Sequence, residues 1–226
     1  MKQFFSRYWR YLLPAVIVLA ALGYWLWTWS QSTANLNRHY SLSDFPGVKG
    51  EEQYIPYVEK INQHYAALRS GVKEQNARFD IWNDIGIRKL ALKDYKGAEI
   101  AWKEAMKVNP KNPLASANLA NLYKSFLPNY PEAERLYLLA ISQNSTAEPY
   151  YPDYEALADL YQNFWKDKAF KVEPLMTSGL AKAFGKDAKL QFNLFLAAYF
   201  KDTDPVKYQQ YEAEVLKLDP SRANQQ

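Results

Sequence analysis

Few residues of this chain have the types and spacing that catalysis requires. The two histidines, His39 and His64, lie far apart, and neither belongs to the pattern of a metal site or a catalytic triad. The acidic pairs are residues 51–52 and Asp202 with Asp204, and charge clusters of this kind at turns are usually solvated. We place His39 in a linker and His64 on a solvated helix face. The sequence predicts no catalytic residue.

Composition and motifs narrow the function further. The chain has no cysteine, which excludes disulfides, thiolate metal sites and cysteine nucleophiles. It has no phosphate-binding loop, dinucleotide fingerprint or nucleophile elbow. We therefore expect no enzyme activity, no cofactor and no metal. The net charge is +4, and removing Lys2, Arg7 and Arg10 leaves 25 basic against 24 acidic residues. This balance favours neither nucleic acid nor anionic lipid as a main partner, and we expect no nucleic acid.

The elements that would position binding residues follow a repeated pattern. Between Phe79 and Asn112, apolar and small residues stand at fixed intervals: Trp82, Ile85, Gly86, Ala98, Trp102, Ala105 and Pro110. This run resembles the 34-residue signature of the tetratricopeptide repeat, a pair of helices that cross closely at the small residues. One departure is Lys89, which stands where the signature has tyrosine, and its aliphatic stem can still cover apolar surface.

Later segments repeat the pattern with decreasing regularity. The second shows Leu119, Ala120, Tyr123, Ala133, Tyr137 and Ala140, and the third shows Leu157, Ala158 and Tyr161. We expect the second helix of the third repeat to run from near Pro174 to Phe184. In the fourth repeat either Leu196 or Ala197 takes the small position. The predicted repeat array covers residues 79–220, with repeats near 79–112, 113–147, 151–186 and 187–220, and 221–226 form a tail.

The resemblance also implies where a partner would bind. In tetratricopeptide proteins the first helices of the repeats line a concave groove that holds a peptide or protein segment. Carried onto this chain, the predicted groove row consists of Asn83, Ile87, Asn118, Asn121, Lys124, Glu155, Asp159 and Gln162. The row is polar and mixed in charge. It lacks the basic clamp that binds C-terminal carboxylates in the chaperone-binding branch of the family.

The aromatic residues offer a second binding surface. Tyrosine and tryptophan are common in inter-helix packing, and we favour that role for most of the 18 tyrosines. Trp165 and Phe170 are the exception, because charged residues 166–168 make the turn between them solvated. These two rings are predicted to form an aromatic platform for a partner.

The N-terminus has the pattern of a transmembrane helix. Residues 12–29 are almost wholly apolar, and no charged residue lies between Arg10 and Arg38. Eighteen helical residues span roughly 27 Å, close to the thickness of the hydrocarbon layer. Aromatic residues cluster at both ends, as they do at headgroup level. The prediction is a basic tail over 1–10 and a bilayer-spanning helix over 11–30.

Charge sets the orientation of this helix. Lys2, Arg7 and Arg10 precede it with no acidic residue, so the positive-inside rule puts the N-terminus in the cytoplasm. Everything after Ser30 would then lie outside the cytoplasm. A cleaved signal peptide is the competing interpretation, with a cleavage site at residues 32–34. The length of the apolar stretch and the tryptophans beside that site favour the uncleaved helix.

Two segments separate the span from the repeats. Residues 31–50 lack helical periodicity and are predicted to be a linker over the membrane surface. Residues 51–77 carry one apolar stripe and are predicted to be a single amphipathic helix that caps the array. The alternative for this helix is dimerisation, since an unpaired stripe must be buried somewhere.

The expected fold is all-α, with an N-terminal transmembrane helix followed by an α-solenoid of about three to four tetratricopeptide repeats. The expected function is a scaffold that binds a protein or peptide outside the cytoplasm, in assembly or client holding of an envelope complex. The span would contact the lipid bilayer. Two alternatives remain: a self-associating structural membrane component, which would form a homo-oligomer, and a receptor of opposite topology that faces the cytosol.

Overall fold

The chain folds into helices. A computed structural model describes residues 35–144 and 148–224, and no strand occurs among them. The α-helices are α2 Ile55–Arg69, α3 Gln75–Ala91, α4 Tyr95–Val108, α5 Pro113–Ser125, α6 Tyr130–Gln143, α7 Tyr151–Asp159, α8 Val172–Lys182, α9 Lys186–Phe200 and α10 Pro205–Leu218. Short 3-10 helices lie at η1 Leu42–Asp44, η2 Pro46–Val48, η3 Glu52–Tyr54, η5 Lys166–Lys171 and η6 Pro220–Asn224, and a π-helical turn at η4 Leu160–Phe164.

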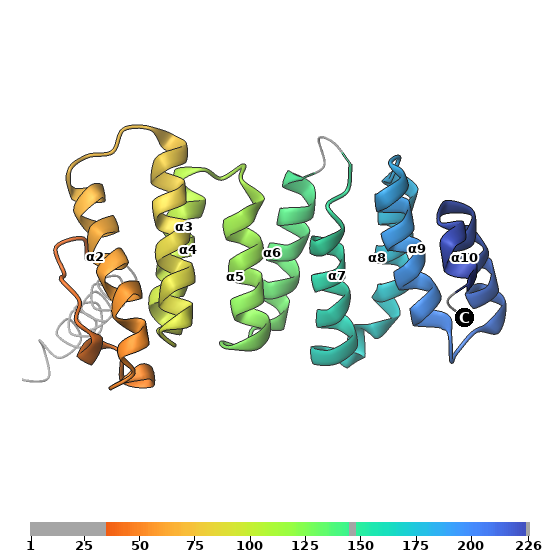
Figure 1. Cartoon of the computed structure of the whole chain (residues 1–226), viewed down its shortest axis with the longest axis horizontal. Helices are drawn as coiled ribbons and strands as arrows, with labels where there is room; N and C mark the ends of the chain where they lie inside the picture. Colours follow the sequence, from red (N-terminus) through yellow and green to blue (C-terminus); the bar gives the residue numbers. More distant parts are fainter. Residues whose placement is uncertain (1–34, 145–147, 225–226) are drawn as a thin grey trace, which may run out of the picture.

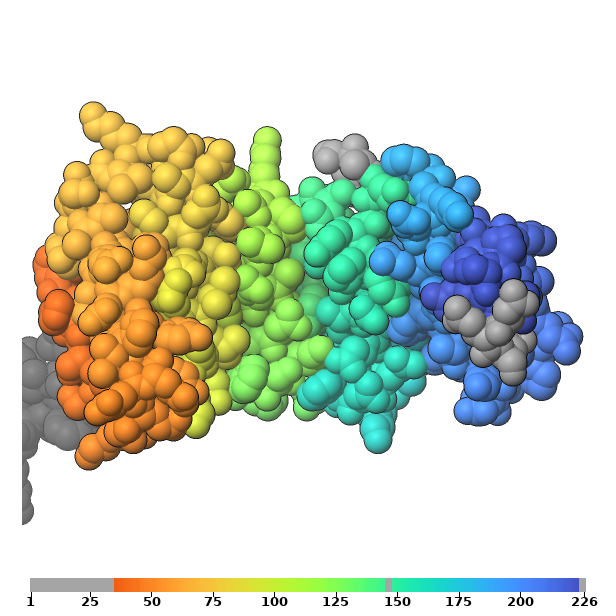
Figure 2. Space-filling model, in the orientation of Figure 1, coloured from red at the N-terminus to blue at the C-terminus, as the bar shows by residue number. Residues whose placement is uncertain are grey.

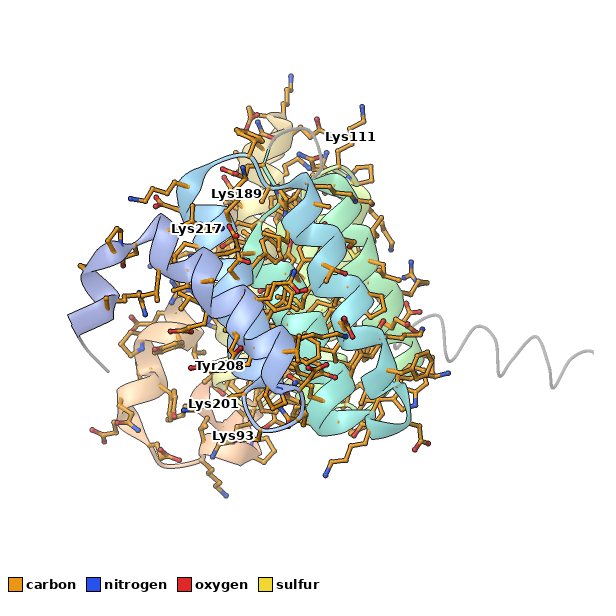
Figure 3. All side chains as sticks on the ribbon, turned by 90° about the vertical axis from the view of Figure 1, so that its right-hand side faces the viewer. Lys93, Lys111, Lys189, Lys201, Tyr208 and Lys217 are labelled. Carbon is orange, nitrogen blue, oxygen red and sulfur yellow. The ribbon has the colours of Figure 1, made fainter. Side chains whose placement is uncertain are left out.

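The helices stand side by side in one elongated row that follows the sequence (Figure 1). Their side chains pack into a continuous body from the α2 end to the α10 end (Figure 2). Successive connections alternate between two edges of the row. Seen end-on, Lys111 of the α4–α5 connection lies at one edge, and Lys93 and Lys201, of the α3–α4 and α9–α10 connections, lie at the other (Figure 3). The arrangement is that of an α-solenoid.

Hydrogen bonds between neighbouring helix pairs repeat at nearly constant sequence separation. Such contacts join residues 34 to 37 positions apart: Asn83 with Asn118, Lys124 with Asp159, Glu134 with Lys171, and Glu173 with Lys207. Each pair therefore occupies nearly the same place relative to the pair before it. Stacking of this kind lets each pair bury the apolar side that it cannot bury alone.

Local sequence signals explain where most helices begin. The side chains of Asp94, Asn112, Asn129 and Asp204 accept hydrogen bonds from backbone N–H groups in the first turns of α4, α5, α6 and α10. These bonds satisfy donors that have no partner within the helix. Proline stands at the first or second position of α2, α5, α6, α7 and α10, where its missing N–H costs little.

The crossing of α3 and α4 depends on a glycine. A Cβ at Gly86 would lie 2.5–2.8 Å from three atoms of the Trp102 indole. Trp102 itself is buried, and its Nε1 has no acceptor among the described residues. The two helices can therefore approach this closely only with glycine at position 86.

The helix predicted over 51–77 is two helices. α2 ends at Arg69, and Gly71 adopts φ 84°, a left-handed conformation that glycine tolerates best. α3 then starts at Gln75, where the Glu74 carboxylate accepts hydrogen bonds from the N–H groups of Asn76 and Ala77. The first repeat thus begins four residues before the predicted position 79. Gly71 lets the chain turn after α2, and the Glu74 cap starts α3, which is why the predicted single helix is divided here.

The described part of the predicted linker, residues 35–50, packs against the first helices. Tyr40, Phe45 and Val48 are buried, and the Tyr40 ring stacks on Tyr65 of α2 at 5.7 Å between centroids. The Asn62 side chain bonds both the N–H and the carbonyl of Tyr40, each at 2.8 Å. The segment from 40 to 48 is therefore part of the core.

The predicted basic tail, 1–10, and transmembrane helix, 11–30, lie outside the described residues. Within the described residues, no helix has the length and apolar character needed to cross a bilayer.

The third pair is less regular than the first two. α7 passes into the π-helical turn η4 and the 3-10 helix η5 before α8 begins at Val172. The predicted helix from Pro174 to Phe184 thus starts and ends two residues earlier, with α8 ending at Lys182. In α9, Leu196 and Ala197 are both buried, so burial does not choose between the two predicted registers. In α10, Val215 alone is fully buried, as expected for the last helix of an array.

The Gly86–Trp102 crossing gives a stability prediction. Gly86→Ala should lower the free energy of unfolding by about 1–2 kcal/mol, because overpacking exceeds the gain in helix propensity. In a Trp102→Leu background the indole is gone, and the same substitution should cost nothing or stabilise. Urea unfolding of the four proteins would measure this coupling. An equal cost of Gly86→Ala in both backgrounds would contradict the close crossing.

Candidate functional site

Neighbouring first helices bring the predicted groove row together in pairs. The side-chain amide nitrogen of Asn118 on α5 donates to the Asn83 oxygen on α3 at 2.9 Å, and Asn83 is buried. One pair further on, Nζ of Lys124 on α5 lies 2.5 Å from a carboxylate oxygen of Asp159 on α7. Both bonds join residues 35 apart. They tie α3, α5 and α7 into a single surface.

The Lys124–Asp159 bridge is partly shielded from water. The Lys124 side chain is 11% exposed, and its ammonium group lies 5.4 Å from the centre of the Phe164 ring. Burial alone would raise the pKa of Asp159, but hydrogen bonds from Lys124 and Asn163 outweigh it and lower that pKa. The aspartate is therefore held ionised, and the bridge fixes α5 against α7.

Asn121 has a structural partner within its own pair. Its side-chain oxygen accepts a hydrogen bond from the hydroxyl of Tyr137 on α6 at 2.6 Å. Tyr137 is fully buried, and burial raises the pKa of its phenol. The amide thus satisfies a buried hydroxyl. Asn121, Lys124 and Asp159, all predicted groove residues, have partners within the fold.

The remaining members of the row differ in exposure. Ile87 on α3 is 45% exposed. Glu155 on α7 is exposed, and its charge and hydrogen bond contribute to the raised pKa of Tyr151, after burial. Gln162 is half-buried. Of the predicted row, Ile87 is the large apolar group accessible to a partner.

The two rings of the predicted aromatic platform differ in exposure. Trp165 is half-buried, with its ring centre 6.4 Å from that of Tyr130 and the Lys168 ammonium 5.4 Å from its own. Phe170 is 69% exposed, and no ring contact joins it to Trp165 among the described residues. Phe164, which sequence reasoning did not select, is exposed beside Tyr130.

A tyrosine–glutamate contact recurs between successive pairs, and sequence reasoning missed it. The hydroxyl of Tyr123 on α5 donates to Glu99 on α4 at 2.6 Å, and that of Tyr161 donates to Glu134 on α6 at 2.6 Å. The tyrosines are signature positions, and the glutamates lie 35 residues apart. This spacing, close to the length of the repeat, is the sequence signal from which the contact could have been predicted. Lys171 adds a second bond to Glu134.

Lys89 occupies the tyrosine position of the first pair and finds other partners. Its ammonium lies 3.0 Å from the Asp94 carboxylate and 4.7 Å from the centre of the Tyr40 ring. Tyr40 belongs to the packed segment before α2. A regular repeat has no such segment. The lysine that replaces the signature tyrosine therefore contacts a ring, Tyr40, that only this N-terminal segment supplies.

The prediction of a solvated face for His64 is wrong. Its Nε2 lies 2.6 Å from a carboxylate oxygen of Asp84 on α3, and the side chain is mostly buried. The same oxygen accepts a bond from Nε of Arg88 at 2.6 Å. Burial would raise the pKa of Asp84, but these two hydrogen bonds lower it. His64 joins the cap helix α2 to the first pair.

Several hollows open on the surface of the part of the chain that the structure describes. One of about 330 Å³ lies between residues 39–42 and α2, and one of about 280 Å³ lies between residues 44–47 and the α3–α4 connection. A larger one of about 730 Å³ lies between the end of α2, the start of α3 and the end of α4.

Comparisons of the chain with protein-family models, with curated proteins and with solved structures found no match.

Glu99 gives a prediction for the pH dependence of stability. Burial would raise its pKa, but hydrogen bonds from Lys103, Tyr123 and Lys96 lower it from 4.5 to about 2. A depressed pKa stabilises the fold above the unfolded-state value, and this contribution is lost as pH falls from about 4.5 to about 2. Glu99→Gln should cost about 1–2 kcal/mol at pH 7, allowing for solvent screening.

The difference in free energy of unfolding between wild type and Glu99→Gln should shrink towards pH 2. Urea unfolding at pH 7, 4, 3 and 2 would measure it. Glu52→Gln is the control, because that carboxylate is exposed. It should follow the wild-type curve. A constant difference for Glu99→Gln at every pH would show that its charge contributes nothing.

Proposed function

We propose that this chain is a membrane-anchored tetratricopeptide-type scaffold that holds a protein or peptide partner outside the cytoplasm. No chemistry of its own is assigned to it. The observation that carries the proposal is the surface of α3, α5 and α7, where paired polar side chains and the exposed Ile87 belong to one predicted row. A surface built in this way is rigid before a partner arrives, which lowers the entropy cost of binding.

The repeat assignment rests on spacing and on packing. The contacts between neighbouring pairs, at separations of 34–37 residues, match a 34-residue unit. Gly86 allows a close crossing at the position where the signature has its small residue, and Ala98 and Ala105 are fully buried in the facing helix. Tyr123 and Tyr161 occupy equivalent positions and make equivalent bonds. These features support a solenoid of tetratricopeptide type.

The membrane anchor and the topology rest on the sequence of residues 1–30. Their apolar run, aromatic ends and preceding basic residues favour a single span with the N-terminus in the cytoplasm. The repeats would then face the extracytoplasmic side, where they could hold a client or a subunit of an envelope complex. The opposite topology, with a cytosol-facing receptor, is the alternative.

Self-association through the cap helix is less well supported than partner binding. The apolar stripe of α2 contributes Val58, Ile61 and Tyr65, all buried. Tyr65 packs edge-on against Trp82 of α3 and stacks on Tyr40. These three side chains are thus covered within one chain, which leaves less of the stripe for contact with a second copy.

Partner capture can be tested at Ile87. A photoreactive residue at position 87 of the full-length chain, in its native membrane, should crosslink one protein partner identified by mass spectrometry. Ile87→Ser should reduce capture of that protein, from a crosslinker at Gln162, by about tenfold, since burying an isoleucine contributes about 1.5–3 kcal/mol. Thermal stability should change little, because the side chain is exposed.

Leu138 on α6 provides the matched control, with 47% exposure against 45% for Ile87. A crosslinker at 138 should miss the partner, and Leu138→Ser should leave capture unchanged. If the Ile87→Ser and Leu138→Ser variants capture the partner equally well, the predicted groove row is not the binding surface. Crosslinks only between copies of this chain would favour the structural component instead.

A further inference from the structure

The hollow at the end of α2 is lined by both apolar and charged side chains. It measures about 730 Å³, within the range of ligand-binding clefts. Leu68 of α2, Val72 of the α2–α3 connection and Val108 of α4 give it apolar walls, and the well-buried Trp82 of α3 contributes to its lining. Gly71, Val72 and Lys73 of the α2–α3 connection line the hollow, which therefore lies at the edge of the row that carries this connection.

The charges at its rim are not balanced. Lys107 is neutralised by Glu104, with 2.6 Å between Nζ and the carboxylate. Lys73 and Arg78 also line the hollow, and neither has an ion-pair partner within residues 35–144 and 148–224. Two unneutralised cations beside the side chains of Leu68 and Val72 favour a ligand with a negative group and a small apolar part.

The position of the hollow limits what can reach it. Leu36, near the start of the described chain, lines the hollow, and its carbonyl accepts a hydrogen bond from Arg69 at the end of α2. The predicted span ends at Ser30, and six residues extend at most about 20 Å. The hollow is therefore tethered close to the bilayer surface, where the headgroup layer adds about 5–7 Å on each side.

We propose that this hollow binds the headgroup phosphate of an anionic phospholipid, with Lys73 and Arg78 contacting the phosphate and Val72 and Leu68 contacting the glycerol end of the lipid. The guanidinium of Arg78 can donate two parallel hydrogen bonds to phosphate oxygens, and Lys73 adds a second positive charge. This inference rests on the membrane anchor of the proposed function. Such a contact would fix the α2 end of the solenoid against the membrane.

The test uses the full-length chain with a photoreactive residue in place of Val72. The protein is reconstituted into vesicles of phosphatidylcholine alone or of phosphatidylcholine with phosphatidylglycerol, and lipid adducts are counted by mass spectrometry. Phosphatidylglycerol should be strongly preferred. Lys73→Gln with Arg78→Gln should reduce its adducts by about tenfold, since each basic residue near an anionic surface contributes about 1 kcal/mol.

Lys189→Gln with Lys201→Gln is the control, because it removes the same charge at the other end of the row (Figure 3). Its adduct yield should equal that of the parent. Equal adducts from both lipids, or adducts unaffected by Lys73→Gln with Arg78→Gln, would overturn the lipid site. In native membranes, labelling of a protein by position 72 in place of lipid would overturn it as well.

A separate measurement distinguishes this inference from the proposed function. Alkaline carbonate should leave the full-length protein in the membrane fraction. Retention combined with no preference for phosphatidylglycerol would reject the lipid site and keep the anchor. Release into the soluble fraction would reject the anchor, and the lipid site with it.

Discussion

The need of each helix pair to bury an apolar side against its neighbours governs the rest of the structure. Two helices of about 13 to 17 residues enclose too little apolar surface to be stable alone, so each pair depends on those before and after it. Ile85, Leu119 and Leu157 are fully or almost fully buried at corresponding positions of successive pairs. At the first end of the row, where no pair precedes α3, the cap helix α2 and the segment around Tyr40 take that place.

Polar contacts then fix the register in which the pairs stack, because apolar burial alone is non-directional and does not specify it. The pairs Asn83–Asn118 and Lys124–Asp159 join first helices on one side, and the Tyr123–Glu99 bond joins a first helix to the second helix before it. Partly buried polar groups are costly when unpaired, so each of these bonds penalises a slipped arrangement. Asn83, Asn118, Lys124 and Asp159 also belong to the predicted groove row, so the bonds that fix the stacking register also shape that row.

Local sequence features predicted the repeated helices well. Gly86, the helix-capping residues and the prolines act over a few residues, so their effects can be inferred without knowing the fold. The packed segment at Tyr40 and Phe45 was missed because its burial depends on contacts with α2 and α3, which are distant in sequence. The break at Gly71 was missed because the apolar stripe of residues 51–77 continues across it.

The sequence predicted which residues share the surface of the candidate site better than it predicted what each side chain contacts. The sequence placed Asn83, Asn118, Lys124 and Asp159 on one surface, but their pairing depends on how two helices meet. Ile87 stands out only once the exposure of its neighbours is known. For the aromatic platform, the charged turn at 166–168 indicated solvent, whereas the contact between Trp165 and Tyr130 depends on tertiary packing.

The absence of cysteine allows the central claim to be measured directly. Single Ile87→Cys and Leu138→Cys variants of the full-length protein would be labelled with a membrane-impermeant maleimide in right-side-out membranes. A partner held on the predicted groove row should slow labelling at position 87 relative to 138, and stripping peripheral proteins should make the two rates equal. Equal rates before stripping would contradict the binding surface, and no labelling at either position without lysis would contradict the topology.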